Sequence, residues 1–504
     1  MKILTAQQVK VLESNTLQAQ SISEYDLTKR AGEVLAKAIS KKLLYHSEFI
    51  FFCGTGKNGA DGLVCAKNLA LQGHKCKVII FKLGKAAHPV FLKSLDTLDQ
   101  TLIKVEYINS LSTFPVIGTK AIIVDALIGT GLNKPITGPL EQIIEKINTY
   151  KSNITIAVDT PTGLGSELSA KSKSVINADV TFTFESPKLD FFFADNYPKV
   201  GDWEILPIKL DKKSLNKIET NNYYLDPLLV KKIAKKLRRL KFAHKGDFGH
   251  TLVIAGSKGK IGSAVLTTKS AVKIGSGLVT SYIPSIGYDI LQISVPEAMT
   301  ITDRGFTHIS DNIFDINQYS SIVVGPGIGT EMVTKKAFEE FINKATRPIV
   351  IDADAINLIS QDISIIDKIP QNSILTPHPK EFDRLVGASS SSIERFEKQK
   401  NFSKRYKQII ILKGAHTSIT LPNGDVYFNS TGNPGMATGG SGDVLAGVIA
   451  GLMAQGLNSE NASLLGVYIH GLAGDFAKRE VGKIGISAGD IVGFLPNALS
   501  TLHI

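Results

Sequence analysis

The sequence is poor in cysteine, tryptophan and methionine, with 3, 1 and 5 of these residues among 504. The cysteines, Cys53, Cys65 and Cys76, are too few for a disulfide framework and do not have the spacing of zinc ligands. Their number excludes a small extracellular domain held together by disulfides. We therefore expect three free, buried thiols in a protein of a reducing compartment.

Long hydrophobic runs are also missing. No stretch approaches the about 20 apolar residues that a membrane-spanning helix needs. The first residues, MKILTAQQVKVLES, lack the apolar core of a signal peptide. There is no short-period repeat and no low-complexity tract. The sequence predicts a globular cytoplasmic protein without membrane partners.

The charge is unbalanced, with 57 lysines and arginines against 46 acidic residues and a net charge of +11. The excess concentrates between residues 212 and 245, where aromatic residues are not interleaved as a base-stacking surface would need. We interpret this segment as a solvated helix and connector, so we expect no nucleic-acid partner. A basic rim that attracts polyphosphate ligands is the alternative.

Strand and helix patterns alternate along both halves of the chain. A capping box at Thr5 and Gln8 predicts a helix through about Leu17, and a second helix is expected over 24–44. Apolar runs that end in glycine, aspartate or a turn predict strands at residues 49–53, 77–81, 121–125, 154–159, 250–255, 277–280, 321–324, 347–352 and 408–412.

This order predicts an α/β protein with two three-layer αβα domains, each built on a parallel sheet with helices on both faces. A chain of 504 residues is too long for one ordinary domain. We expect an N-terminal domain over residues 1–212, a basic connector over 213–240 and a C-terminal domain over 241–504.

The strongest sign of chemistry is the glycine-rich run from Asn433 to Asp443, which precedes an apolar helix pattern. Bare backbone N–H groups and a helix N-terminus together form an anion hole. A carboxylate beside a phosphate site is typical of a base that takes a proton from the attacking hydroxyl. The alternative is a glycine-rich turn in which Asp443 caps the helix.

A second glycine loop, GTGKNGADG at residues 54–62, follows the first strand and opens a helix. It satisfies the dinucleotide pattern G-x-G-x-x-G, so a Rossmann-like N-terminal sheet is expected. The ribose-binding acid of an oxidoreductase is missing, because Phe81 and Lys82 end the second strand instead. No Gly-Lys-Ser/Thr closes the loop, which excludes a Walker A motif.

Two strands of the first half end in aspartate, at Asp125 and Asp159. Carboxyl ends of parallel strands meet at one edge of a sheet, so these residues are expected near Asn58 and Thr162. The ligand atoms are all hard oxygens, which suit an alkali or alkaline-earth cation. The alternative for each aspartate is a helix cap.

The loop at 54–62, VDALIGTGL at 124–132 and VDTPTG at 158–163 resemble the NAD(P)H-hydrate epimerase family over about residues 1–210. Lys57 and Ala60 replace an asparagine and a glycine usual there, and Thr160 and Thr162 replace isoleucine and serine. Lys57 is expected to strengthen phosphate binding or to crowd the site. The resemblance implies that Asp159 is catalytic and that Asn58, Asp125 and Thr162 hold potassium. It implies hydrate contacts from Lys57, Asn58, Gly59, Ala60, Asp61, Gly129, Thr130, Gly131, Leu132, Asn133, Lys134 and Asp159.

The run ending in Asp443 resembles the ribokinase-like superfamily. Together with the segments 244–250, 256–280, 325–330, 352–357, 375–382 and 412–417, it resembles the ADP-dependent NAD(P)H-hydrate dehydratase family. The whole chain resembles bifunctional NAD(P)H-hydrate repair enzymes. This implies that Asp443 is catalytic, with hydrate contacts from Ala264, Gly327, His378 and Asp443, and ADP contacts from Lys413, Gly414, Ala415, His416, Thr417 and Gly442.

For several residues of the second half, the sequence leaves two interpretations open. Asp352 and Asp354 either face magnesium and phosphates or cap the next helix. His378 lies between two prolines, which favours a positioned ligand contact over a purely structural role. The segment that begins at Lys413 is either a nucleotide cradle or a simple strand exit. Lys380 departs from the family's glycine and places a positive charge near the hydrate site.

The leading hypothesis is a repair enzyme for hydrated NADH and NADPH. Its first half would epimerise the R and S hydrates, and its second would dehydrate the S form with ADP, giving NAD(P)H, AMP and phosphate. Potassium, magnesium and ADP are the expected cofactors and co-substrate, and a homo-oligomer is expected. The alternatives are a vitamin or sugar kinase fused to a dinucleotide-binding module, and a non-enzymatic nucleotide sensor, against which Asp443 argues.

Overall fold

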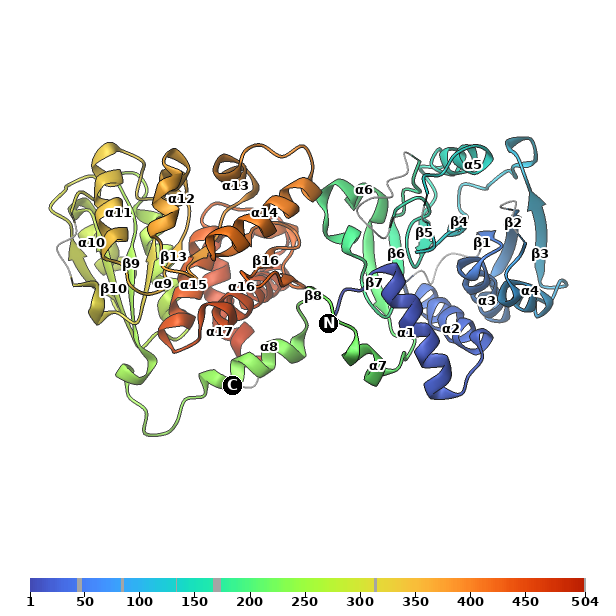
Figure 1. Cartoon of the computed structure of the whole chain (residues 1–504), viewed down its shortest axis with the longest axis horizontal. Coiled ribbons are helices and arrows are strands. Elements are labelled where there is room, and N and C mark those ends of the chain that lie inside the picture. Colours follow the sequence, from blue (N-terminus) through green and yellow to red (C-terminus); the bar gives the residue numbers. More distant parts are fainter. Residues whose placement is uncertain (43–47, 83–85, 133, 166–173, 312–314, 503–504) are drawn as a thin grey trace. The chain divides into compact units, whose positions relative to one another are not determined.

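The structure is a computed structural model that describes residues 1–42, 48–82, 86–132, 134–165, 174–311 and 315–502. The chain divides into two compact units, Lys2–Thr220 and Asn221–Ile504, and Met1 joins the second (Figure 1). The segment expected as a basic connector is shared between them. Helix α7 (Lys212–Lys217) belongs to the first unit, whereas β8 (Asn222–Tyr224) and α8 (Pro227–Ala234) belong to the second.

The first unit is built on a seven-stranded sheet in the order β3-β2-β1-β4-β5-β6-β7, and every neighbouring pair is parallel. The prediction of a parallel α/β sheet is confirmed. Strands β3, β6 and β7 were not predicted, because their buried positions do not form continuous apolar runs. The strands are β1 (Glu48–Gly54), β2 (Lys75–Phe81), β3 (Ile103–Ile108), β4 (Ile122–Ala126), β5 (Thr155–Val158), β6 (Val180–Phe184) and β7 (Asp202–Leu206).

Apolar side chains cover both faces of this sheet. Phe49 and Phe51 of β1 pack with α2, α3 and α4 on one face, and Ile50 and Phe52 pack with α5 on the other. Burial on both faces explains why β1 reads as an unbroken apolar run. The predicted capping box of α1 is present at Thr5. The helices are α1 (Ala6–Gln20), α2 (Glu24–Lys42), α3 (Lys57–Leu71), α4 (Pro89–Asp96), α5 (Pro139–Ile147), α6 (Tyr197–Val200) and α7.

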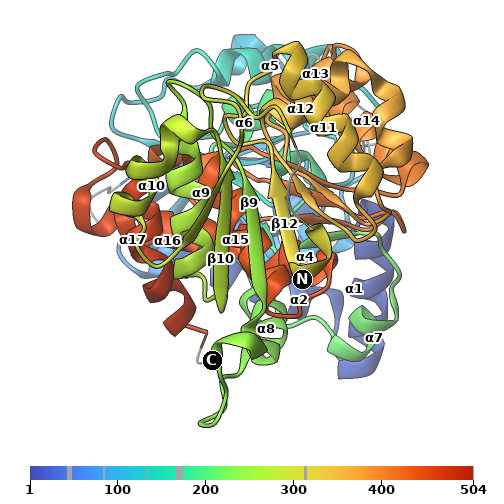
Figure 2. The ribbon, with the colours of Figure 1, turned by 90° about the vertical axis from the view of Figure 1, so that its left-hand side faces the viewer.

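The second unit contains a ten-stranded sheet in the order β11-β10-β9-β12-β13-β14-β15-β16-β17-β8. Its first seven strands are parallel, β16 and β17 form an antiparallel extension, and β8 pairs parallel to β17. Figure 2 shows β10, β9 and β12 side by side. The strands are β9 (His250–Ile254), β10 (Leu278–Ile283), β11 (Met299–Thr302), β12 (Ser321–Val324), β13 (Val350–Ile351), β14 (Ile374–Leu375), β15 (Ile409–Leu412), β16 (Ser418–Thr420) and β17 (Val426–Phe428).

Helices cover both faces of this sheet as well. Helices α8, α9, α10, α15, α16 and α17 contribute to the core on one face, and α11, α12, α13 and α14 contribute to the core on the other. No helix among the described residues is long and apolar enough to cross a membrane. The remaining helices are α9 (Ile261–Lys273), α10 (Tyr288–Ser294), α11 (Met332–Lys344), α12 (Asp354–Gln361), α13 (Pro379–Val386), α14 (Ser392–Tyr406), α15 (Ser441–Ala454), α16 (Ser459–Val481) and α17 (Ala488–Ser500).

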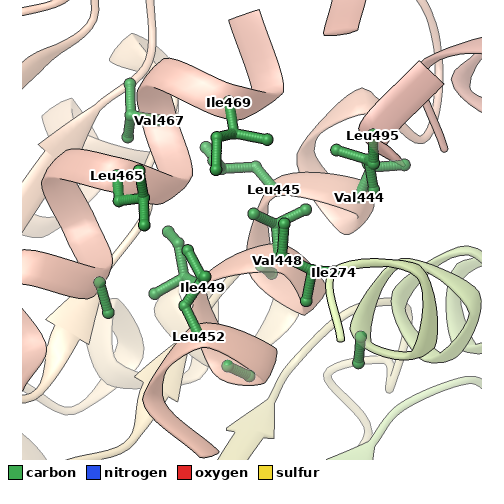
Figure 3. Packing of buried hydrophobic residues seen from close by; sticks show 14 of the residues in the cluster. Ile274, Val444, Leu445, Val448, Ile449, Leu452, Leu465, Val467, Ile469 and Leu495 are labelled. Carbon is green, nitrogen blue, oxygen red and sulfur yellow. The ribbon is translucent and has the colours of Figure 1, made fainter. Parts of the chain in front are cut away.

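Helix α15 lies at the centre of one of these cores (Figure 3). Val444, Val448 and Ile449 are fully buried, and each such side chain contributes about 1.5–3 kcal/mol by leaving water. A Cβ on Gly447 would lie 2.2 Å from the Thr267 carbonyl oxygen of α9, so only glycine allows this close crossing. The buried crossing fixes the position of the N-terminus of α15, where the glycine-rich run ends.

Candidate active sites

The candidate site of the second unit lies at the carboxyl edge of the ten-stranded sheet. Strands β9, β12, β13, β14 and β15 are parallel neighbours, so their carboxyl ends share one edge. The predicted motifs GSKGK, GPGIGT, DAD, TPHP and KGAHT each begin at one of these ends. The sheet therefore collects motifs that are far apart in the sequence.

Asp443 lies in the first turn of α15. The N-cap is Gly440, which makes no side-chain capping hydrogen bond, so the interpretation of Asp443 as a helix cap is wrong. Instead the hydroxyl of Ser263, on α9, hydrogen-bonds to Asp443. Burial and the nearby Asp352 carboxylate raise the pKa of Asp443 to about 6, against the opposing effects of Ser263 and Lys413. A carboxylate with a pKa near neutral is suited to general-base chemistry.

Lys413 and Asp352 form a buried ion pair beside α15. The Lys413 Nζ to Asp352 Oδ1 distance is 3.0 Å, and the hydroxyl of Thr376 donates to the same oxygen at 2.7 Å. Burial is the largest single effect and lowers the pKa of Lys413, but Asp352, Glu381 and Asp443 together outweigh it, so the pKa is raised. A Cβ on Gly442 would lie 3.1 Å from Lys413 Nζ, so glycine at 442 keeps room for the ammonium group.

The second oxygen of Asp352, Oδ2, is buried without a hydrogen-bond partner among the described residues. Asp354 is bound by the Lys260 ammonium at 3.1 Å and the Gly329 N–H at 2.9 Å. Helix α12 has Ala353 as its N-cap, without a side-chain capping bond. The helix-cap interpretation of Asp352 and Asp354 is therefore wrong, and both carboxylates lie among the loops of the sheet edge.

The candidate site of the first unit also lies at a carboxyl edge, that of β1, β4 and β5. Asp125 is fully buried and accepts hydrogen bonds from the Thr162 N–H and the Thr162 hydroxyl, each at 2.7 Å. Burial raises the pKa of Asp125 to about 6, although the Thr162 bonds lower it. Helix α5 begins far downstream with Gly138 as its N-cap, so Asp125 is not a helix cap.

Asn58 lies beside this pair at the start of α3. A Cβ on Gly129 would lie 3.0 Å from Asn58 Oδ1, which places the amide against the loop after β4. The Ile128 N–H of the same loop donates to the Thr162 hydroxyl oxygen at 2.9 Å. The Asn58 Nδ2 is buried and has no partner among the described residues. The structure thus brings together three of the residues expected around a cation.

Asp159 follows β5 in a left-handed conformation, with φ of 64°. Its Oδ1 accepts hydrogen bonds from the Thr183 hydroxyl and the Phe184 N–H, each at 3.2 Å, and lies 3.0 Å from Lys188 Nζ. Its side-chain partners are thus β6 and the segment after it, rather than a helix end. Left-handed geometry at a non-glycine residue costs about 1–3 kcal/mol and is concentrated at functional sites.

The comparisons with known proteins agree with this geometry. A family model described as NAD(P)H-hydrate dehydratase matches residues 251–497, and one described as the YjeF-related protein N-terminus matches residues 24–189. The bifunctional NAD(P)H-hydrate repair enzymes of Thermofilum pendens and Moorella thermoacetica are each 32% identical over 100% of this chain and 97% of their own. The chain belongs to the family of bifunctional NAD(P)H-hydrate repair enzymes.

Other similar proteins are more distant. The Escherichia coli repair enzyme is 29% identical over 93% of this chain and 88% of its own. A solved ADP/ATP-dependent NAD(P)H-hydrate dehydratase from Bacillus subtilis, co-crystallised with ATP/Mg2+, is 26% identical over 56% of this chain and 100% of its own, with a TM-score of 0.49.

Family membership decides between the hypotheses drawn from the sequence. The chain is a bifunctional NAD(P)H-hydrate epimerase and dehydratase. A vitamin or sugar kinase fused to a dinucleotide-binding module is excluded as the main description, and so is a non-enzymatic sensor.

Lys57 and Ala60, two of the predicted hydrate contacts, lie in the first turn of α3. Lys57 Nζ lies 2.5 Å from Glu24 and 3.4 Å from Glu13, so its charge is compensated by two carboxylates. Ala60 is fully buried in the core of the first unit. Burial, Glu13 and Asp159 raise the pKa of Asp61 well above its usual value. Asn133 lies outside the described residues.

In the dehydratase half, the predicted hydrate contacts His378, Ala264 and Gly327 lie in three different surroundings. His378 is the N-cap of α13, with its Nδ1 accepting from the N–H groups of Lys380 and Glu381. It therefore has the structural role, and its Nε2 lies 3.4 Å from Glu381 Oε1, so a ligand would have to share this nitrogen with Glu381. Ala264 is fully buried in the core, and Gly327 lies next to Lys260 of the GSKGK segment and Ser263 of α9.

The segment from Lys413 to Thr417 joins the antiparallel strands β15 and β16. The Gly414 N–H donates to the Thr417 hydroxyl at 3.3 Å, so the segment is closed as a turn. An added Cβ on Gly414 would have no atom within 4 Å, which leaves open space above the turn. His416 of the same segment is partly buried, and burial lowers its pKa.

Sequence reasoning missed three polar residues of these sites. His470 of α16 is buried, with Nε2 3.0 Å from the Ser441 carbonyl oxygen, and burial lowers its pKa to about 4. A single histidine in an otherwise apolar helix pattern was its only signal. Ser263 and Lys188 contact the two key aspartates. Ser263 lies within the segment 256–280 but was not singled out there, and Lys188 belongs to no motif found in the sequence.

Proposed function

We propose that Asp443 is the base for dehydration of the S hydrate and that Asp159 serves epimerisation of the R and S hydrates. The observation that carries the first assignment is the position of Asp443, whose pKa is raised, within the first turn of α15 and beside Lys413. A proton-accepting group, a helix N-terminus and a cation are the parts that phosphoryl transfer needs.

In the dehydratase, Asp443 takes the proton from the C6 hydroxyl of the hydrate. The hydroxyl oxygen attacks the β-phosphorus of ADP, and the bond to the bridging oxygen breaks to release AMP. The new phosphate ester is a better leaving group than hydroxide. The ring nitrogen lone pair expels it as phosphate, and loss of a proton from C5 restores the dihydronicotinamide. The N–H groups of Gly439 to Gly442 stabilise charge on the transferred group.

ADP is proposed to lie along the turn from Lys413 to Thr417, with Gly442 at its phosphates. The open space above Gly414 supports this placement. Magnesium would be held by Asp352 and Asp354, because Asp352 Oδ2 is a buried carboxylate oxygen that lacks a partner among the described residues. A bound magnesium ion would neutralise charge on the phosphates. Hydrate contacts are proposed from the backbone near Ala264 and Gly327, and from His378 Nε2.

In the epimerase, the ring nitrogen expels the C6 hydroxyl together with one proton as water. Addition of water to the other face of the ring releases one proton and gives the other epimer, so no proton is gained or lost overall. We assign that proton transfer to Asp159. The first turn of α3, residues 57–61, and the segment from Gly129 to Lys134 would hold the dinucleotide, and Gly131 and Lys134 are exposed to receive it.

A potassium ion in the epimerase would be held by Asn58, Asp125 and Thr162. The donors are hard oxygens with one formal charge, which suits a monovalent cation. The buried Asn58 amide supports the site, because rotating it by 180° replaces the unpartnered Nδ2 with its oxygen. The proposed substrates of the enzyme are NADH hydrate and NADPH hydrate. The homo-oligomer expected from the sequence stays a prediction.

The direct test is to incubate the protein with a mixture of R and S NADH hydrates and either ADP or ATP. We expect complete recovery of absorbance of the reduced nicotinamide, with AMP formed, and a faster reaction with ADP than with ATP. Replacing potassium by lithium should slow consumption of the R form while leaving that of the S form unchanged. A stable phosphorylated product without NADH would contradict the dehydration mechanism.

Dehydration should also depend on pH through Asp443. A base works when ionised, so kcat/KM for the S hydrate at low ADP should fall about tenfold per pH unit below the pKa of about 6. Above pH 7 it should be nearly constant. Rapid-mixing measurements between pH 5 and 8 check this. A flat profile over that range would mean that Asp443 does not limit the reaction.

A further inference from the structure

Lys188 is a buried lysine in the first unit that belongs to no motif found in the sequence. It follows β6 in the segment Glu185-Ser-Pro-Lys188, and only 3% of its side chain is exposed. Lysine is almost never buried unless it is paired, because its charge is costly to remove from water. The partner of Lys188 is Asp159, whose Oδ1 lies 3.0 Å from Nζ. Nζ also donates to the Ser186 carbonyl oxygen at 3.2 Å.

The contacts of Asp159 are unequal between its two oxygens. Lys188 Nζ, the Thr183 hydroxyl and the Phe184 N–H all bind Oδ1. Among the described residues, no hydrogen bond is made to Oδ2. The backbone of Asp159 is fixed too, because its N–H donates to the Phe182 carbonyl oxygen at 2.7 Å. The carboxylate is therefore anchored through one oxygen, and the other remains for a ligand.

Asp159 lies among other carboxylates, and Lys188 is the cation that contacts it. Asp159 interacts electrostatically with Glu13 of α1 and Asp61 of α3, so three carboxylates share this part of the unit. Lys57 is already paired with Glu13 and Glu24. Lys188 is thus the cation in direct contact with Asp159 within the described part of the unit.

We propose that Lys188 is a positioning residue of the epimerase, which pairs its charge with Asp159 at Oδ1 and directs Oδ2 to the hydrate. The inference rests on the proposed role of Asp159. Lys188 itself donates to Oδ1 and to a backbone carbonyl, so it acts on the reaction through Asp159. The short segment after β6 places Lys188 at the end of β5, where Asp159 lies.

The test compares Lys188→Met, Lys188→Arg and Asp159→Asn in the full-length enzyme. Methionine keeps a long apolar side chain but removes the charge. We expect Lys188→Met to lower epimerase kcat at least about tenfold with little change in KM, and to move the acidic limb of the pH profile upward by about one unit. Lys188→Arg should restore the position of that limb, because it restores the cation. Dehydration of purified S hydrate should remain normal in both.

Lys77→Met is the matched control, since Lys77 is also an ion-paired lysine of this sheet, 2.8 Å from Glu106. Its epimerase rate and pH profile should not change. A Lys188→Met protein with wild-type kcat and pH profile, alongside an inactive Asp159→Asn, would overturn the inference and leave the role of Asp159 intact. Activity in both variants would overturn the role of Asp159 itself. A loss of activity with an unchanged pH profile and a lower thermal midpoint would show a purely structural lysine and also overturn the inference.

Discussion

The substitution Asp443→Asn is expected to lower the rate of dehydration at least about 10²-fold, the lower end of a general-base contribution. Asparagine keeps the shape of the side chain and its contact with Ser263 but cannot accept the proton. ADP binding should persist or tighten, because a negative charge near the phosphates is removed. Single-turnover dehydration of the S hydrate and calorimetric titration with ADP measure the two effects separately.

Asp490→Asn is a matched control for this substitution. Asp490 is the third residue of α17, as Asp443 is of α15, but it accepts from Ser487 in an exposed capping box. Its replacement should leave dehydration unchanged. Near-normal turnover in Asp443→Asn would remove Asp443 from the mechanism, and lost ADP binding would assign it to the nucleotide site instead.

The substitution Asp159→Asn is expected to stop interconversion of the two hydrates while leaving dehydration intact. With excess ADP, a racemic mixture should then be consumed quickly only to about half, the fraction in the reactive form, because the proton-transfer group is lost. Slow spontaneous epimerisation would account for the rest. The end-point of NADH recovery, compared with that of wild type, is the measurement.

Asn58→Ala should give the same end-point by removing a proposed potassium ligand. Purified S hydrate is the internal control, since both variants should dehydrate it at the wild-type rate. The reason is structural: Asp159 and Asn58 lie in the unit Lys2–Thr220, and Asp443 lies in the other. If both variants consumed the whole mixture as fast as wild type, the proposed epimerase site would be wrong.

Core strands and helix ends could be predicted from the sequence because their patterns are local. The run at 49–53 is apolar on both faces of a covered parallel sheet, and the Thr5 capping box is present as predicted. The edge strand β3 was missed because only its end residues, Ile103 and Ile108, are buried, so it has no apolar run. The ten-stranded sheet gained β8 through its pairing with β17, about 200 residues further along the chain, which no local pattern indicates. Strands β16 and β17 form a local hairpin around Asn423 and Gly424, a turn signal that the sequence reasoning overlooked.

The sequence by itself determined the two-part α/β organisation, the glycine-rich run before Asp443 and the family of the chain. Each of these features is a contiguous stretch of residues, so the order of residues along the chain is enough to predict it. Only the tertiary structure decided that Asp443 is not a helix cap, that Lys413 pairs with Asp352, and that Lys188 holds Asp159. The physical reason is that ion pairing and burial depend on which strand ends become neighbours. Lys413 and Asp352 are 61 residues apart in the chain, and the parallel sheet is what brings their side chains to 3.0 Å.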